Sequence, residues 1–191
     1  MREISWQTLS PDDEIYDALV LPQQTHSANI VEIVTGDENV SECDGVWSRG
    51  SKFLLGVKTA DCAPIVFRAA DRFGIIHCGW RGLRSGIIEN MLQHFGNESE
   101  IDIGPLYPQF EIRRDFAYES LSQRFGEQFF LHSKDTIIFD FLAAIQSILP
   151  QARWCGINTY QNLKYASWRR EGELIRERGQ NITVVGRNCH S

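Results

Sequence analysis

Residues 53–82 read FLLGVKTADCAPIVFRAADRFGIIHCGWRG and decide the fold of this chain. The stretch holds three apolar runs, rich in β-branched and aromatic residues and separated by short polar turns. Such runs predict strands, here at 52–58, 64–68 and 72–77. Beyond His77 the apolar residues recur at helical spacing as far as Phe95, and Gly96 follows as a C-cap, so the sequence predicts a strand-to-helix turn followed by a helix.

Outside this stretch, strands and helices are intermixed along the chain. The same patterns predict further strands at 28–34, 100–103 and 181–185 and helices at 115–125 and 139–149. Intermixed elements of this kind are typical of a layered α/β or α+β domain. The 191 residues contain no internal repeat or linker-like tract, so we expect one domain spanning 1–191.

Composition limits the class of protein. Apolar residues make up 42% of the chain, and the net charge is −6 with a pI near 5.4, which argues against nucleic acid or an anionic membrane as a partner. The first twenty residues contain neither a secretory signal nor a membrane span, so we expect a cytoplasmic protein. An odd number of cysteines, five, favours free thiols or a metal ligand over a disulfide framework.

His26, Cys62 and His77 each border one of the apolar runs, where a strand end would hold a side chain rigidly. Zinc favours thiolate and imidazole donors, and three protein ligands leave a fourth position open for water or substrate. The spacing matches no compact zinc motif. Taken singly, the residues also fit a capping histidine, a buried cysteine and a core histidine. Cys62 and His77 also fit a nucleophile and its base; the second histidine favours metal.

Two segments are candidates for binding an anion. In the GWRG turn at 79–82, glycines expose backbone amides where a helix begins, and Arg81 adds a planar guanidinium next to Gly82. The second segment, SWRRE, contains Arg169 and Arg170, and adjacent residues on a regular element cannot point the same way. At most one of these arginines should therefore enter a pocket. The alternatives are a tightly packed turn and a solvated charged surface.

Three acidic residues are weaker candidates. Asp61 directly precedes Cys62, and Glu111 follows a loop braced by Gly104 and Pro105, so either could transfer protons at the site. Asp44, in CDGVW, fits either a functional acid or the side chain that closes an Asx turn.

Six segments together resemble one known family, the YfiH-type, polyphenol-oxidase-like proteins now regarded as purine nucleoside phosphorylases. They are QTHSANIVEI, CDGVWSRG, LLGVKTADCAPIVF, IIHCGWRGLRSGII, IGPLYPQFEI and SWRRE. The resemblance runs from about Gln23 to Arg187. It implies a cytosolic, zinc-dependent enzyme that cleaves adenosine, inosine, guanosine and methylthioadenosine with phosphate and also deaminates adenosine. The family's metal ligands match His26, Cys62 and His77.

The resemblance also implies a fold. We expect two mixed β-sheets flanked by helices in a single layered α+β domain, similar to YfiH and distantly similar to cysteine hydrolases. We expect the protein to act as a monomer or homodimer. We also expect an N-terminus that is shortened relative to the family and lacks an upstream strand pair. Zinc is favoured over copper, because one site with a single thiolate lacks the several centres of a multicopper oxidase.

Two alternatives to this enzyme remain open. One is a metal-free Cys-His amide hydrolase or deamidase that acts on a cell-wall precursor peptide. The other is a nucleoside-binding or metal-binding protein with reduced or no turnover.

Overall fold

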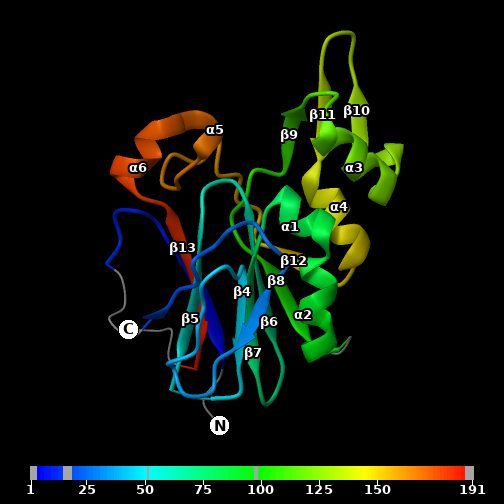
Figure 1. Ribbon diagram of the computed structural model, residues 1–191. Coiled ribbons are helices and arrows are strands. Elements are labelled where there is room, and N and C mark those ends of the chain that lie inside the picture. The colour runs from blue at the N-terminus through cyan, green and yellow to red at the C-terminus, as the bar shows by residue number, and fades with distance from the viewer. Residues whose placement is uncertain (1–3, 15–18, 51, 97–98, 188–191) are drawn as a thin grey trace.

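A computed structural model describes residues 4–14, 19–50, 52–96 and 99–187 of the chain (Figure 1). The strands are β1 (Ser5–Leu9), β2 (Leu19–Val20), β3 (Ile30–Glu32), β4 (Gly45–Ser48), β5 (Leu54–Thr59), β6 (Ala63–Arg68), β7 (Phe73–Cys78), β8 (Glu100–Ile103), β9 (Gln109–Ile112), β10 (Phe130–His132), β11 (Ile137–Asp140), β12 (Arg153–Trp154) and β13 (Asn181–Gly186). The helices are α1 (Trp80–Ser85), α2 (Ile87–Phe95), α3 (Phe116–Phe125), α4 (Phe141–Ile148), α5 (Trp168–Glu171) and α6 (Ile175–Arg178), with short 3-10 turns at Glu127–Phe129 and Gly172–Leu174.

The described strands form two mixed sheets and one smaller antiparallel sheet. The first mixed sheet has the order β1-β13-β5-β2 and the second has the order β12-β8-β6-β7-β4-β3. The third sheet, β10-β11-β9, stands beside α3 at one end of the molecule (Figure 1). The two mixed sheets flanked by helices are therefore confirmed, and the small antiparallel sheet is an addition that the sequence pattern does not predict.

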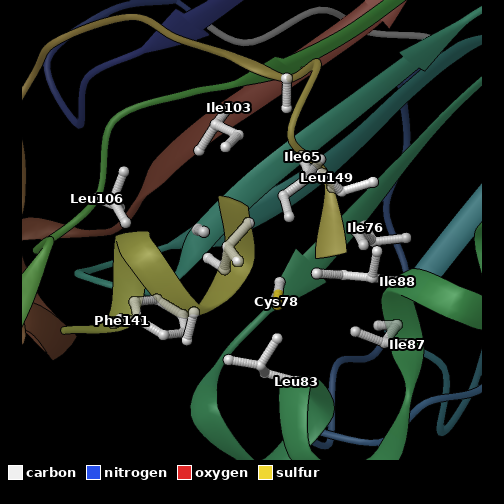
Figure 2. Packing of buried hydrophobic residues seen from close by; sticks show 14 of the residues in the cluster. Ile65, Ile76, Cys78, Leu83, Ile87, Ile88, Ile103, Leu106, Phe141 and Leu149 are labelled. Carbon is white, nitrogen blue, oxygen red and sulfur yellow. The ribbon is translucent and has the colours of Figure 1, made fainter. Parts of the chain in front are cut away.

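Alternating side chains of the central strands build two cores. On β6, Val66 points toward the four-stranded sheet and packs in one cluster with Leu55 and Val57 of β5. Its neighbours Ile65 and Phe67 point to the opposite face, as the two-residue period of a strand requires. There they pack in a second cluster with residues of α1, α2 and α4, including Leu83, Ile87, Ile88 and Phe141 (Figure 2). The layers are thus sheet, sheet and helices.

The helix predicted after His77 is broken in two. Gly86 adopts φ 88°, in the left-handed region, where it ends α1 and begins α2. Its backbone N–H bonds to the carbonyls of Gly82 and Leu83, which is the usual way in which a left-handed glycine closes a helix. Helical spacing of the apolar residues continues across the break, because both helices pack on the same sheet face.

Several other boundaries differ from the sequence pattern. The helix predicted from residue 139 begins at Phe141, because Asp140 caps it by accepting a hydrogen bond from the Ala143 N–H at 3.0 Å, and Phe139 belongs to β11. Strands β1 and β2 lie upstream of His26, where no strand is predicted. Both are half-buried and form the two edges of the first mixed sheet, so they lack the long apolar runs of the central strands.

Sheet register brings distant segments together at one end of the central strands. β6 and β7 are antiparallel, with Pro64 opposite His77, so Cys62 just before β6 lies beside the end of β7. β4 also pairs with β7, and the N–H of His77 donates to the carbonyl of Asp44 at 2.7 Å. No helix in the described ranges is long and apolar enough to cross a bilayer.

Candidate metal centre

His26, Cys62 and His77 meet at this end of the central strands of the six-stranded sheet. One ligand atom from each residue lies within 4.8 Å of the others. The two imidazole rings are 4.8 Å apart between centroids and stand nearly perpendicular, at 78°. His77 is buried, Cys62 is half-buried and His26 is exposed, so the site opens to solvent on the side of His26.

Asp44 holds two of these ligands in place. Its Oδ1 accepts hydrogen bonds from Nδ1 of His77 at 2.7 Å and from the backbone N–H of His26 at 3.0 Å. Its Oδ2 accepts from the N–H groups of Thr25 and Ser27, at 3.1 and 2.7 Å, and from the Ser27 hydroxyl at 2.8 Å. This carboxylate is completely buried. Burial alone would raise the pKa of Asp44, but the hydrogen bonds from His77, Ser27 and Thr25 outweigh it and lower the pKa to about 2.

The Asp44 contacts explain the geometry of both histidines. With Nδ1 of His77 bonded to Asp44, its Nε2 is the nitrogen left for the site, an arrangement found behind many metal-ligating histidines. His26 adopts φ 61°, a conformation that non-glycine residues rarely adopt. The backbone N–H groups of its neighbours Thr25 and Ser27 donate hydrogen bonds to Asp44, and these stabilise the turn. Asp44 therefore closes the turn and also orients a ligand.

The thiol and the buried imidazole form an ion pair in the metal-free protein. Burial would raise the pKa of Cys62, but the adjacent His77 and the hydrogen bond from His26 outweigh it and lower that pKa to about 6. Burial would lower the pKa of His77, but the Cys62 thiolate and the Asp44 carboxylate raise it to about 9. Cys62 is thus a thiolate at neutral pH, the form that binds metals or attacks as a nucleophile.

The donor set fits a metal ion. Two imidazole nitrogens and one thiolate are the ligands that zinc and copper prefer, and three protein donors leave a position for water or substrate. Because a buried carboxylate already orients His77, the site is largely preformed.

The two glycines of the GWRG turn provide space for this site. A Cβ on Gly79 would lie 3.0 Å from Sγ of Cys62 and 3.1 Å from Cδ2 of His26, so the absence of a side chain at Gly79 leaves space for both ligands. A Cβ on Gly82 would lie 3.0 Å from the carbonyl oxygen of Ser27, next to His26. Gly82 therefore brings α1 into close contact with the histidine loop, where the sequence predicted an anion-binding amide. The sequence pattern does not predict the contact of Gly79 with the ligands.

Asp61 makes its contacts away from the thiol. Its Oδ1 accepts from the Thr159 hydroxyl at 2.7 Å and its Oδ2 from the backbone N–H of Arg169 at 2.8 Å. Its carbonyl accepts from the N–H of Tyr107 at 2.9 Å, and φ is 87°. The carboxylate thus joins the Cys62 turn to two distant segments.

The two adjacent arginines have different environments. The guanidinium of Arg170 donates to the carbonyls of Thr159, Tyr160 and Tyr165 and to Oε1 of Glu171, at 2.5–2.9 Å. The Arg170 guanidinium therefore donates to its own loop, where the sequence left it as a candidate for binding an anion. Arg169 is exposed.

Arg169 and Arg81 both lie against aromatic rings. The guanidinium of Arg169 lies 5.2 Å from the centre of the Phe110 ring and donates to the carbonyl of Glu111 at 3.3 Å. Arg81 is exposed in α1, 4.8 Å from the centre of the Trp80 ring. The side chain of Glu111 is exposed on β9.

A cavity of about 410 Å³ lies between the 10–13 segment, α5 and α6, away from these donors. None of the three ligands lines it. Cys43, Cys62, Cys78 and Cys155 are free thiols, as the odd count predicts, and Cys189 lies outside the described residues.

The fold and the two-histidine, one-cysteine cluster together define a YfiH-like α+β protein with a candidate metal site. The chain belongs to the family described as multi-copper polyphenol oxidoreductase laccase, whose pattern matches residues 7–188. The fold agrees with solved structures. A Neisseria meningitidis protein superposes with a TM-score of 0.76 at 22% identity, over 88% of this chain and 74% of that one. YfiH from Bacillus licheniformis superposes with a TM-score of 0.75 at 19% identity, over 88% and 74%.

Two relatives are named purine nucleoside phosphorylase. The protein from Rickettsia conorii is 31% identical over 183 residues, covering 87% of this chain and 76% of its own length. The protein from Aquifex aeolicus is 31% identical over 130 residues, covering 63% of each. The aligned part thus spans just under two thirds of the Aquifex protein. These names support a phosphorylase-like enzyme in this family.

Proposed function

We propose that the chain is a zinc-dependent purine nucleoside phosphorylase that also deaminates adenosine. Its substrates would be inorganic phosphate and adenosine, inosine, guanosine or methylthioadenosine. The observation that carries the proposal is the meeting of His26, Cys62 and His77 around an open position, with His77 oriented by the buried Asp44. The names of the relatives supply the reaction class.

His26, Cys62 and His77 would hold the zinc ion. A zinc ion bound there would supply Lewis-acid chemistry and lower the pKa of a coordinated water. Phosphorolysis also needs phosphate to be held against the anomeric carbon of the ribose, which calls for cationic donors near the site. Arg81 and Arg169 are the candidates, because both are exposed and neither guanidinium is buried in a loop as that of Arg170 is.

The two candidate acids, Asp61 and Glu111, are given different roles. Both carboxylate oxygens of Asp61 accept hydrogen bonds from Thr159 and Arg169, so we propose Asp61 as a positioning residue. Glu111 is exposed on β9 next to the Arg169 guanidinium, which leaves it as the candidate proton donor or acceptor.

Zinc is favoured over copper because the donors form a single metal centre. Within the described ranges His26, Cys62 and His77 form one cluster with a single thiolate, fewer centres than multicopper oxidation uses. We further propose that the enzyme acts in the cytoplasm as a monomer or homodimer.

The test is a phosphate-dependent nucleoside assay on the purified chain with its metal content measured. Wild-type protein should convert inosine and phosphate to hypoxanthine and ribose 1-phosphate, and adenosine to inosine. Cys62→Ala should abolish both reactions and lose the metal. Cys155→Ala, which removes an exposed thiol outside the cluster, is the matched control and should retain them. A metal-loaded wild type that forms no product would refute the proposal.

A second candidate function is favoured by the ion pair between Cys62 and His77. A thiolate whose pKa is about 6, beside an imidazole that can return a proton, is the arrangement of a metal-free cysteine amidase acting on a cell-wall precursor peptide. Chelation separates the two candidates. Loss of activity with the chelator and its return with zinc support the phosphorylase, whereas chelator-resistant peptide hydrolysis that Cys62 alkylation stops supports the amidase.

A further inference from the structure

Two tyrosines form an aromatic pair that is open to solvent. The rings of Tyr107 and Tyr160 stack at 5.2 Å between centroids and 28° between planes. Tyr107 is half-buried, whereas Tyr160 keeps 44% of its surface exposed. Tyr160 therefore presents an aromatic ring that is held by stacking on one side and is partly open to solvent.

The pair is attached to the turn that carries the Cys62 thiolate. The N–H of Tyr107 donates to the carbonyl of Asp61 at 2.9 Å, and the hydroxyl of the buried Thr159 donates to Oδ1 of Asp61 at 2.7 Å. Asp61 directly precedes Cys62 in the chain. Each tyrosine is thus connected to the metal-ligand turn, Tyr107 by its own amide and Tyr160 by the adjacent threonine.

The loop that carries Tyr160 is held by polar contacts. The N–H of Thr159 donates to the carbonyl of Leu106 at 3.0 Å, and the N–H of Tyr160 donates to Oδ1 of Asn158 at 3.0 Å. Nη1 of Arg170 donates to the carbonyls of Thr159 and Tyr160 at 2.6 and 2.9 Å. The backbone on both sides of Tyr160 is therefore fixed, and the exposure of its ring is a property of the folded loop.

The same aspartate also fixes a cation. Oδ2 of Asp61 accepts from the N–H of Arg169, whose guanidinium lies over the ring of Phe110. Asp61, the residue before Cys62, thus positions both a flat aromatic surface and an exposed guanidinium. A nucleoside undergoing phosphorolysis has a flat base on one side of its ribose and receives phosphate on the other, so the two surfaces match the two reactants.

We infer that the Tyr107–Tyr160 pair is the stacking surface for the nucleobase and that Tyr160 is a specificity-determining residue for purines. The inference rests on the proposed function for the identity of the ligand. Stacking of a base on an aromatic side chain needs a π-face and does not need hydrogen-bond readout. A purine covers more of the ring than a pyrimidine does, so the surface favours purine nucleosides.

The test measures binding apart from turnover. Inosine, which cannot undergo phosphorolysis without phosphate, is titrated by calorimetry into wild-type protein and three variants, with metal content and Tm measured for each. Tyr160→Phe retains the π-face and should bind within about twofold of wild type. Tyr160→Ala and Tyr160→Leu should each bind at least about fivefold more weakly, because leucine supplies apolar bulk without a π-face. Leu163→Ala, a change at a 73% exposed residue of the same loop, is the control and should bind as wild type does.

Kinetics supply a second readout. In Tyr160→Leu the KM for inosine should rise while the KM for phosphate stays unchanged, and the preference for inosine over uridine should shrink. Equal inosine binding by Tyr160→Leu and wild type, or no inosine binding by the wild type, would overturn the inference. Tyr160-dependent binding without any product would support the stacking surface while refuting the phosphorylase, so the two proposals fail separately.

Discussion

The carboxylate of Asp44 accepts a hydrogen bond from Nδ1 of His77 at 2.7 Å. Both residues are shielded from solvent, because Asp44 is 0% exposed and His77 is 3% exposed. A carboxylate buried this deeply is stable only because His77 and the amides of the His26 loop supply donors. The contact decides which nitrogen of His77 faces Cys62. It also couples the two histidines, because one side chain holds both.

Replacing Asp44 should weaken metal binding. Asp44→Asn keeps the shape of the side chain but removes the negative charge that fixes the tautomer of His77, so zinc affinity should fall about 10- to 100-fold. Competition with a fluorescent zinc chelator measures this affinity. Asp102→Asn is the control, since Asp102 is also a buried carboxylate but bonds to Trp6, Arg68 and Arg153 elsewhere in the fold. Unchanged zinc affinity in Asp44→Asn would contradict the assigned role.

A methyl group at Gly79 should disturb the ligands directly. Gly79 has φ −91°, which alanine also adopts, so Gly79→Ala adds no backbone strain. The added Cβ would nevertheless lie 3.0 Å from Sγ of Cys62, and the sulfur or the His26 ring must move. We expect the zinc affinity to fall at least about tenfold, by analogy with the loss of a contact that orients a ligand.

Gly50→Ala provides the matched control for that methyl group. Its Cβ would approach the Phe53 ring at 2.9 Å, a contact of similar closeness that involves no ligand. Calorimetric zinc titration of both variants should show a loss in Gly79→Ala alone. Equal affinities would mean that the site tolerates the methyl group.

The reactivity of Cys62 in metal-free protein should depend on pH with a midpoint near pH 6. The thiolate reacts with iodoacetamide, and His77 lowers the pKa of Cys62 to about 6, so the rate should rise through that pH and level off above it. Peptide mapping by mass spectrometry at each pH gives the rate for each cysteine. Cys155 is the internal reference, because desolvation raises its pKa above the ordinary value. A Cys62 midpoint near that of an ordinary thiol would refute the ion pair.

Substitutions of the two adjacent arginines should affect different properties, stability for Arg170 and phosphate binding for Arg169. Arg170→Gln removes donors from three backbone carbonyls of the 159–165 loop, and stability should fall by about 1–3 kcal/mol, measured by urea unfolding. Arg169→Gln should leave stability nearly unchanged, because its side chain is exposed, and should raise the KM for phosphate. The opposite pattern in the two variants would show that the assignments are reversed.

Sequence periodicity predicted the central strands well. The strand predicted at 100–103 coincides with β8, and those predicted at 64–68 and 72–77 differ from β6 and β7 by a single residue at the ends. These strands are buried on both faces, so their apolar runs are long and clear. Edge strands such as β1 and β12, and the small sheet β9 to β11, contain mixed residues because only part of each surface is buried.

Local pattern could not predict the helix break at Gly86. The apolar residues on either side keep helical spacing, because α1 and α2 cover the same sheet, and a single glycine within a helical pattern is often tolerated. The left-handed conformation appears only when the two helices must turn to follow the sheet surface.

The sequence by itself determined the chemical identity of the site: two imidazoles and one thiol, each bordering an apolar run that had to become a strand. It also indicated free thiols and a layered α+β fold. Tertiary structure alone decided that the three donors meet, that Asp44 orients His77, and that Arg170 is committed to its loop. The reason is physical. Periodicity reports which side chains are buried, whereas sheet register and hydrogen bonds between distant segments decide which buried groups become neighbours.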